Sequence, residues 1–168
     1  MSLADDIAPG LSGMEQLQAM MRAGRMAGIG ISLGFTLVEA EAGRTVFEGT
    51  PGPHAYNPIG TVHGGYAASL LDSACGCAVH SRLRADQGYT TLELKVAYHK
   101  AMTDKTGPVR AEGKVLSLGR RAAFTEARLT DAAGTLYAAA TSTLLVFERG
   151  PRRRCRRGGA AFPSPIAP

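Results

Sequence analysis

The chain has 168 residues, of which 45% are hydrophobic and 20% charged, and this composition fits one soluble globular domain with extensions. No stretch approaches the roughly 20 apolar residues that cross a bilayer. The first ten residues have neither the basic nor the apolar region of a secretory signal, so we expect a cytoplasmic protein with no membrane partner.

The formal net charge of +5 resides in the C-terminal segment. Six of the 19 basic residues follow residue 148, where there are no acids, which leaves 13 basic against 14 acidic residues before it. Residues 149–168 are also poor in the apolar side chains that would offset ordering, so we expect a disordered basic tail. We therefore expect no specific binding of nucleic acid.

The segment 1–30 is predicted to be an N-terminal helical extension, because four apolar residues recur at helical spacing: Met14, Leu17, Met20 and Met21. Glycines at 28, 30 and 34 then interrupt the pattern without the spacing of a dinucleotide-binding loop. Residues 31–50 alternate as two strands joined near Ala42 and Gly43, which predicts a hairpin.

A second helix is predicted from Gly64 to about Leu83, and small or apolar residues cover nearly all of its faces, as is typical of a buried helix. Four strand-like segments separated by turn residues follow, and they suggest an antiparallel meander. The fold class is therefore α+β, with a sheet curled around one helix over residues 31–148.

The three cysteines, Cys75, Cys77 and Cys155, are odd in number and form no disulfide framework. Cys75 and Cys77 are followed by His80, which raises the question of a metal site. Positions two apart on a helix point about 200° apart, so the two sulfurs could hardly share one zinc ion. We interpret them as core-filling thiols.

The acid Asp72 stands among apolar residues of the predicted buried helix. An ionised carboxylate in such surroundings costs several kcal/mol unless it is paired or hydrogen-bonded, so folding alone gives no reason for it. The alternative is an acid on a solvent-facing strip or one bonded to Ser69 or Ser73. Because the surrounding residues leave little polar strip, we favour a carboxylate on the wall of a wetted pocket.

The helix start at Gly64 and Gly65 would present unpaired N–H groups and partial positive charge to a substrate oxygen. This is a plausible oxyanion hole, although two glycines also suit a tight turn. Gly64 and Asp72 are eight residues apart, or about 12 Å along a helix, too far to share one carbonyl within one subunit. A symmetric dimer with sites built from two chains follows as a hypothesis.

The segment NPIGTVHGGYAASLLD, residues 57–72, resembles the hot-dog fold acyl-CoA thioesterases of the phenylacetate-degradation (PaaI-like) type. The resemblance extends over roughly residues 30–147, including TTLELKVAYHKA and GRRAAFTEARLTDAAGTLYAAATSTLLVF. It implies a long central helix wrapped by an antiparallel sheet, a homodimer or homotetramer, and hydrolysis of acyl- or aryl-acyl-CoA without a metal or redox cofactor.

The resemblance also implies roles for individual residues. The N–H of Gly64, helped by Gly65, would polarise the thioester carbonyl, and Asp72 of the partner subunit would act as general base or as nucleophile. Asn57 and His63 would orient the carbonyl region or the active-site loop, and Thr91 would hold the attacking water. Separately, two arginines at a strand start could bind the phosphates of coenzyme A or form a solvated surface pair: Arg120 and Arg121.

Two other functions stay open on the same fold. One is a non-catalytic acyl-CoA-binding or regulatory protein, against which Asp72, Asn57 and the HGG turn argue. The other is a dehydratase or hydratase, which would need a catalytic histidine in a local motif that the sequence lacks. The preferred acyl group does not follow from the sequence.

Overall fold

The structure is a computed structural model in which residues 10–149 are described, so Cys155 and nearly all of the expected tail lie outside the described residues. In chain order the elements are α2 (Gly13–Arg22), α3 (Gly28–Leu33), β1 (Phe35–Glu41), β2 (Arg44–Gly49), η1 (Pro53–Ala55), α4 (Gly64–His80), β3 (Gln87–Tyr98), η2 (Asp104–Thr106), β4 (Val109–Leu118), β5 (Ala122–Asp131) and β6 (Leu136–Glu148).

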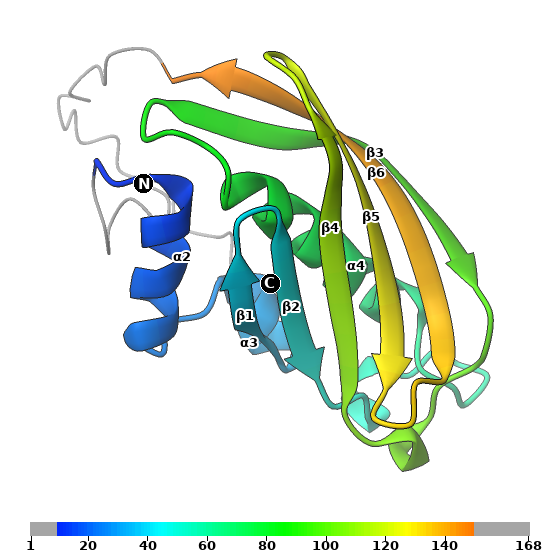
Figure 1. Cartoon of the computed structure of the whole chain (residues 1–168). Coiled ribbons are helices and arrows are strands. Elements are labelled where there is room, and N and C mark those ends of the chain that lie inside the picture. The colour runs from blue at the N-terminus through cyan, green and yellow to red at the C-terminus, as the bar shows by residue number, and fades with distance from the viewer. Residues whose placement is uncertain (1–9, 150–168) are drawn as a thin grey trace, which may run out of the picture.

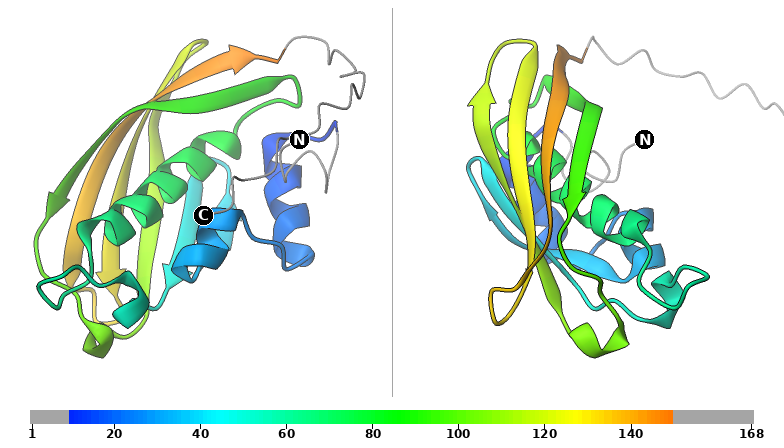
Figure 2. Two further views of the ribbon diagram at one scale, coloured as in Figure 1. Left: turned by 180° about the vertical axis from the view of Figure 1, so that it is seen from behind. Right: turned by 90° about the vertical axis from the view of Figure 1, so that its right-hand side faces the viewer.

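The six strands form one antiparallel sheet in the order β1-β2-β4-β5-β6-β3, and the sheet curves around α4 (Figures 1 and 2). The predicted α+β class and the hairpin at residues 42–43 are confirmed. The predicted four-strand meander is wrong for its first strand, because β3 pairs with β6 and not with β4. The long helix α4 carries the chain from β2 to the far edge of the sheet, and β4 then returns to pair with β2.

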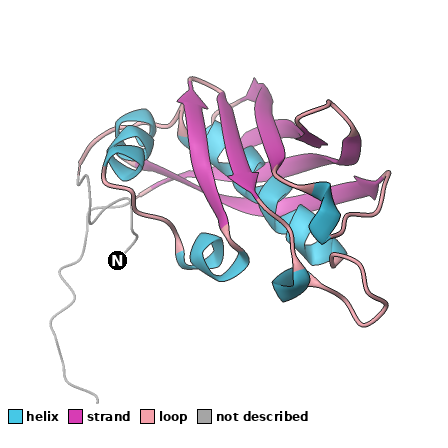
Figure 3. Ribbon diagram, turned by 90° about the horizontal axis from the view of Figure 1, so that it is seen from below, coloured by secondary structure: helices cyan, strands magenta, loops and turns pink. Residues whose placement is uncertain are grey.

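The core lies between α4 and the concave face of the sheet, and the strands curve around the helix when seen from below (Figure 3). Leu70 and Leu71 are fully buried, and each contributes about 1.5–3 kcal/mol through the apolar surface removed from water. On β4, Gly113 lies against the helix backbone, where an added Cβ would be 2.4 Å from the Ala74 carbonyl carbon. This contact fixes the height of α4 above the sheet.

The N-terminal segment forms two helices instead of one. A capping box starts α2, in which the backbone N–H of Ser12 donates to Glu15 Oε2 at 2.9 Å. Two of the glycines expected to interrupt the pattern, Gly28 and Gly30, belong to the short helix α3, and the third, Gly34, is its C-cap in the left-handed conformation with φ 69°. The domain boundary expected after residue 30 therefore falls inside α3.

Within residues 10–149, no helix combines the length and the apolar character that crossing a bilayer requires.

Candidate active site

Asp72 projects from the middle of α4 and is half-buried. Its Oδ1 accepts a hydrogen bond of 3.0 Å from the Thr91 hydroxyl, the only donor to this carboxylate among the described residues. A β-bulge in β3 directly after Thr91 shifts the register against β6. Asp72, Ser73 and Thr91 together line one side of a cavity of about 320 Å³. The structure therefore places this acid on a pocket wall, where Oδ1 is hydrogen-bonded and Oδ2 accepts no hydrogen bond from the described residues.

The start of α4 is organised by His63, which is its N-cap. The Nδ1 of His63 accepts a hydrogen bond of 2.8 Å from the Gly65 N–H, so this N–H is already used. No group in the described part of the chain accepts a hydrogen bond from the Gly64 N–H. Gly64 thus offers a free donor at the electropositive end of a 17-residue helix.

Tyr98, at the end of β3, lies against this helix start. Its hydroxyl donates to the Gly64 carbonyl at 3.0 Å, and a Cβ added to Gly64 would lie 3.0 Å from the tyrosine ring. Gly64, Tyr98, His63 and Lys100 border a second cavity of about 320 Å³, which shares no lining residue with the Asp72 cavity. Within one chain the carboxylate and the helix start therefore open onto different cavities.

Asn57 holds the loop that leads into α4. Its Oδ1 accepts hydrogen bonds from the N–H groups of Ile59 (3.1 Å) and Thr61 (3.2 Å), and its Nδ2 donates to the Thr61 hydroxyl at 3.0 Å. All of these partners lie within four residues, so Asn57 shapes this loop and the approach to His63.

The chain is similar to known proteins over most of its described residues. The family model described as "Thioesterase superfamily" matches residues 59–138, the segment that contains α4 and most of the sheet. Conserved protein PA5202 from Pseudomonas aeruginosa is 30% identical, with 73% of this chain and 95% of that chain covered and a TM-score of 0.68. The chain belongs to the thioesterase superfamily.

Its fold is the hot-dog fold of the PaaI-like members. A mutant of the phenylacetic acid degradation protein PaaI from Thermus thermophilus is 25% identical, with 71% of this chain and 98% of that chain covered and a TM-score of 0.64. Thioesterase HI1161 from Haemophilus influenzae, 17% identical with 84% and 94% covered and a TM-score of 0.71, shares the fold. Comparison with curated protein sequences gives no match.

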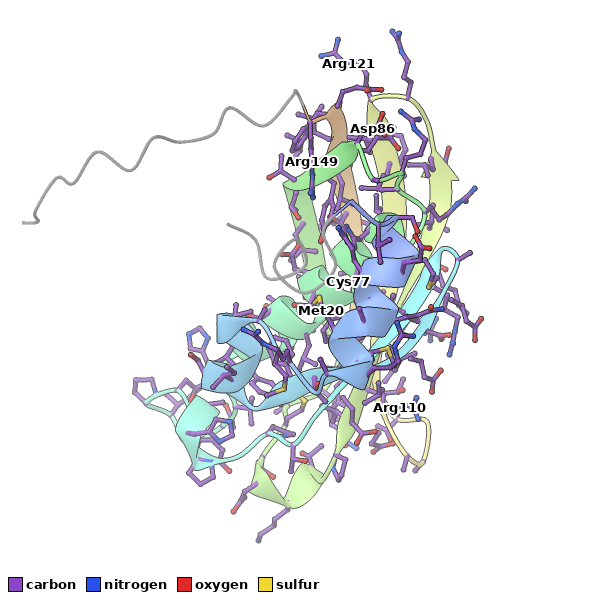
Figure 4. All side chains as sticks on the ribbon, turned by 90° about the vertical axis from the view of Figure 1, so that its left-hand side faces the viewer. Met20, Cys77, Asp86, Arg110, Arg121 and Arg149 are labelled. Atoms are coloured by element: carbon purple, nitrogen blue, oxygen red, sulfur yellow. The ribbon has the colours of Figure 1, made fainter. Side chains whose placement is uncertain are left out.

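In this thioesterase-superfamily chain, Arg120 and Arg121 lie apart from both halves of the site. They are exposed in the turn between β4 and β5, where they border a third cavity with residues 145–148. Figure 4 shows Arg121 near Asp86 and Arg149 at one tip of the sheet, well away from Cys77 in the middle of the molecule. One chain does not bring these arginines to Asp72, and their binding of phosphate stays a prediction.

Several neighbours of the site were not singled out from the sequence. Tyr98 is one, and no local motif marks it. Others are Met20, Met21 and Met26, which line the Asp72 cavity; the spacing of the first two suggested only a helix. Burial raises the pKa of the Cys77 thiol to about 12 and that of Cys75 to about 11, so both are protonated at neutral pH and unsuited to nucleophilic attack. Among residues 10–149, no cluster of three metal-ligating side chains is present.

Proposed function

We propose that the chain is an acyl-CoA thioesterase, which hydrolyses a thioester to a free acid and coenzyme A. The observation that carries the proposal is the Asp72 carboxylate on the wall of a mainly apolar cavity, with a single hydrogen bond from Thr91. A few polar groups that converge on a mainly apolar cavity are typical of a binding or catalytic site. The thioesterases among the structural relatives support the same reading.

The working site is built from two subunits joined through β3. This 12-residue strand is an edge of the sheet, since β6 lies on one side of it and no strand of the described residues lies on the other. A long free edge presents unpaired backbone groups to a second chain. Leu92 on this strand is 62% exposed, which also suits a covered edge in a dimer.

The contacts of β3 with α4 place the two halves of the site near opposite ends of this strand. Thr91 contacts Asp72, and Tyr98 contacts Gly64. In an antiparallel β3–β3 pair, the Thr91 end of one strand lies beside the Tyr98 end of the other. The carboxylate of one subunit then lies beside the helix start of its partner.

The chemistry needs both halves. The Gly64 N–H, aided by the helix dipole, donates to the thioester oxygen and stabilises the negative charge that develops on it. In the general-base route, Asp72 removes a proton from water, the oxygen attacks the acyl carbon, and the C–S bond breaks with the proton passing to the sulfur of coenzyme A. In the nucleophile route the carboxylate attacks the acyl carbon, the C–S bond breaks and coenzyme A leaves as its thiolate, and water then hydrolyses the acyl-aspartyl anhydride to the free acid and restores Asp72. Rapid quench with mass spectrometry separates the routes, because only the second leaves an acyl group on Asp72.

Three further residues act through position. Thr91 fixes one oxygen of Asp72 and leaves the other free for water. His63 caps α4 and takes up the Gly65 N–H, which leaves Gly64 as the donor. Asn57 holds the loop before the helix start.

The test is the variant Asp72→Asn, which keeps the shape and the Thr91 hydrogen bond but removes the base. We expect release of free thiol from an acyl-CoA panel to fall by about 10³-fold or more, with unchanged circular dichroism. The exposed outer-face acid Glu126, changed to Gln, is the matched control and should retain activity. Undiminished turnover in Asp72→Asn removes this acid from the mechanism. Wild-type protein that binds acyl-CoA but releases no thiol is a binding protein.

A further inference from the structure

We propose that the N-terminal helix α2 and the segment 23–27 form the roof of an acyl-binding pocket that selects a medium-length apolar acyl group. The inference rests on the proposed function and adds to it the substrate class and the residues that determine it. It concerns the part of the chain before β1, outside the residues matched by the thioesterase family model.

The lining of the cavity beside Asp72 is partly polar and partly apolar. Its polar residues include Asp72, Ser73 and Thr91, next to which a thioester carbon would react. The rest is largely apolar and includes three methionines from the N-terminal segment, Met20, Met21 and Met26. An acyl tail that leaves the carboxylate therefore runs under α2.

The same arrangement can be seen in the placement of two labelled residues. Met20 on α2 and Cys77 on α4 both line the cavity, and they are close to each other in Figure 4. The Cys77 thiol stays protonated because burial raises its pKa to about 12, so it presents an uncharged surface to the tail. Phe35 and Phe47, packed edge to face with ring centroids 6.0 Å apart, add an aromatic wall.

The volume of the cavity sets the size of the group. A cavity of about 320 Å³ has room for several water molecules and is much larger than an acetyl group requires. An octanoyl or a phenylacetyl group fills more of it.

The roof is anchored at the start of α2 and exposed at its other end, in residues 21–29. In the first turn of α2, the Gly13 N–H donates to the Leu83 carbonyl at 3.0 Å, and Gln16 Oε1 lies 2.9 Å from His80 Nε2. A Cβ on Gly13 would be 1.8 Å from the His80 carbonyl oxygen, so the start of α2 sits directly on the end of α4. Residues 21–29, by contrast, are all exposed. Unbranched, polarizable methionine side chains there adjust to linear or aromatic tails.

The experiment compares acetyl-, octanoyl-, phenylacetyl- and palmitoyl-CoA as substrates of the full chain. We expect the wild type to prefer octanoyl- and phenylacetyl- over acetyl-CoA by at least about tenfold in kcat/KM, since apolar burial in a pocket discriminates on that scale. Met20→Trp should fill the cavity and lower the ratio of kcat/KM for octanoyl-CoA to that for acetyl-CoA by about tenfold or more. Gln18→Trp, at an exposed position of α2 outside the cavity, is the matched control.

Met26→Trp repeats the test outside the helix, in case the Met20 variant does not fold. Binding of the non-hydrolysable thioether S-octyl-CoA, measured by calorimetry, gives a second readout that is independent of hydrolysis. Octyl binding that both tryptophan variants weaken supports the roof even if no thioester is cleaved, in which case only the proposed reaction fails. A wild type without preference between acetyl and octanoyl groups, or tryptophan variants that match Gln18→Trp, overturns the inference.

Discussion

Replacing Gly64 with proline removes one N–H group and leaves the helix start almost unchanged. Proline is favoured at the first helical position, and its missing N–H is the one that no described group accepts. The preceding residue, His63, has φ −62° and ψ 137°, a conformation that a following proline allows. The variant should therefore fold, and its defect should be chemical.

The expected size of this defect follows from the role of the donor. Loss of one oxyanion donor typically lowers kcat by about 10² to 10³, or roughly 2.7–4 kcal/mol of transition-state stabilisation. Proline also adds a Cβ, which lies 3.0 Å from the Tyr98 ring. Gly64→Ala adds the same Cβ but keeps the N–H, so it measures the steric part alone. Because the tyrosine ring is the movable end of a side chain, we expect that part to cost at most about 1 kcal/mol.

The assay is thiol release from octanoyl-CoA under saturating substrate, with the thermal midpoint of each variant as a check on folding. We expect kcat to be at least about tenfold lower for Gly64→Pro than for Gly64→Ala. Equal turnover in the two folded variants would show that the Gly64 N–H does not meet the oxyanion.

Three further outcomes are expected. Thr91→Val removes the hydroxyl that donates a hydrogen bond to Asp72, so kcat should fall by about ten- to a hundredfold with little change in KM. An unchanged kcat would assign the hydroxyl a structural role. Gly113→Ala forces a Cβ against the Ala74 carbonyl and should lower the free energy of unfolding by about 3 kcal/mol. Urea titrations measure this change, and an unchanged urea midpoint would contradict the close packing of β4 on α4. Hydrogen bonds from Arg44 lower the pKa of the Glu39 and Glu112 carboxyls, so these ion pairs stabilise the fold above the unfolded pKa of about 4.3 and lose this effect as the pH falls. The difference in free energy of unfolding between the wild type and Arg44→Met should therefore shrink below that pH. A difference that stays constant with pH would argue against the pairing.

The sequence predicted most of the fold because its periodicities are local. Small and apolar residues on nearly every face predicted a buried helix near residues 64–83, and α4 ends at His80. The pairing of β3 was missed, since strand order depends on where a long helix delivers the chain and no short-range pattern encodes that. The split between α2 and α3 was missed for a different reason. Glycine has a low helix propensity, but Gly30 packs so closely on the Phe35 carbonyl oxygen that a Cβ would lie 2.7 Å from it, and tertiary contact decides its structure.

For the candidate site, the spacing along one helix was sufficient to predict that Asp72 and Gly64 do not meet within one chain. Their surroundings were not predictable in this way. Thr91 came from a family resemblance, while Tyr98 and Met20 reach the two cavities from elements that are distant in sequence. Contacts of this kind depend on the curvature of the sheet and on the docking of α2.

The most direct test of the two-subunit site mixes two inactive variants. Asp72→Asn chains keep an intact helix start, and Gly64→Pro chains keep an intact carboxylate. If each site combines the two halves from different chains, unfolding and refolding an equimolar mixture should restore about a quarter of the wild-type activity, because half of the dimers are mixed and each has one complete site. Activity that stays at the level of the separate variants, in mixtures shown by mass spectrometry to contain mixed dimers, would contradict a site shared between subunits.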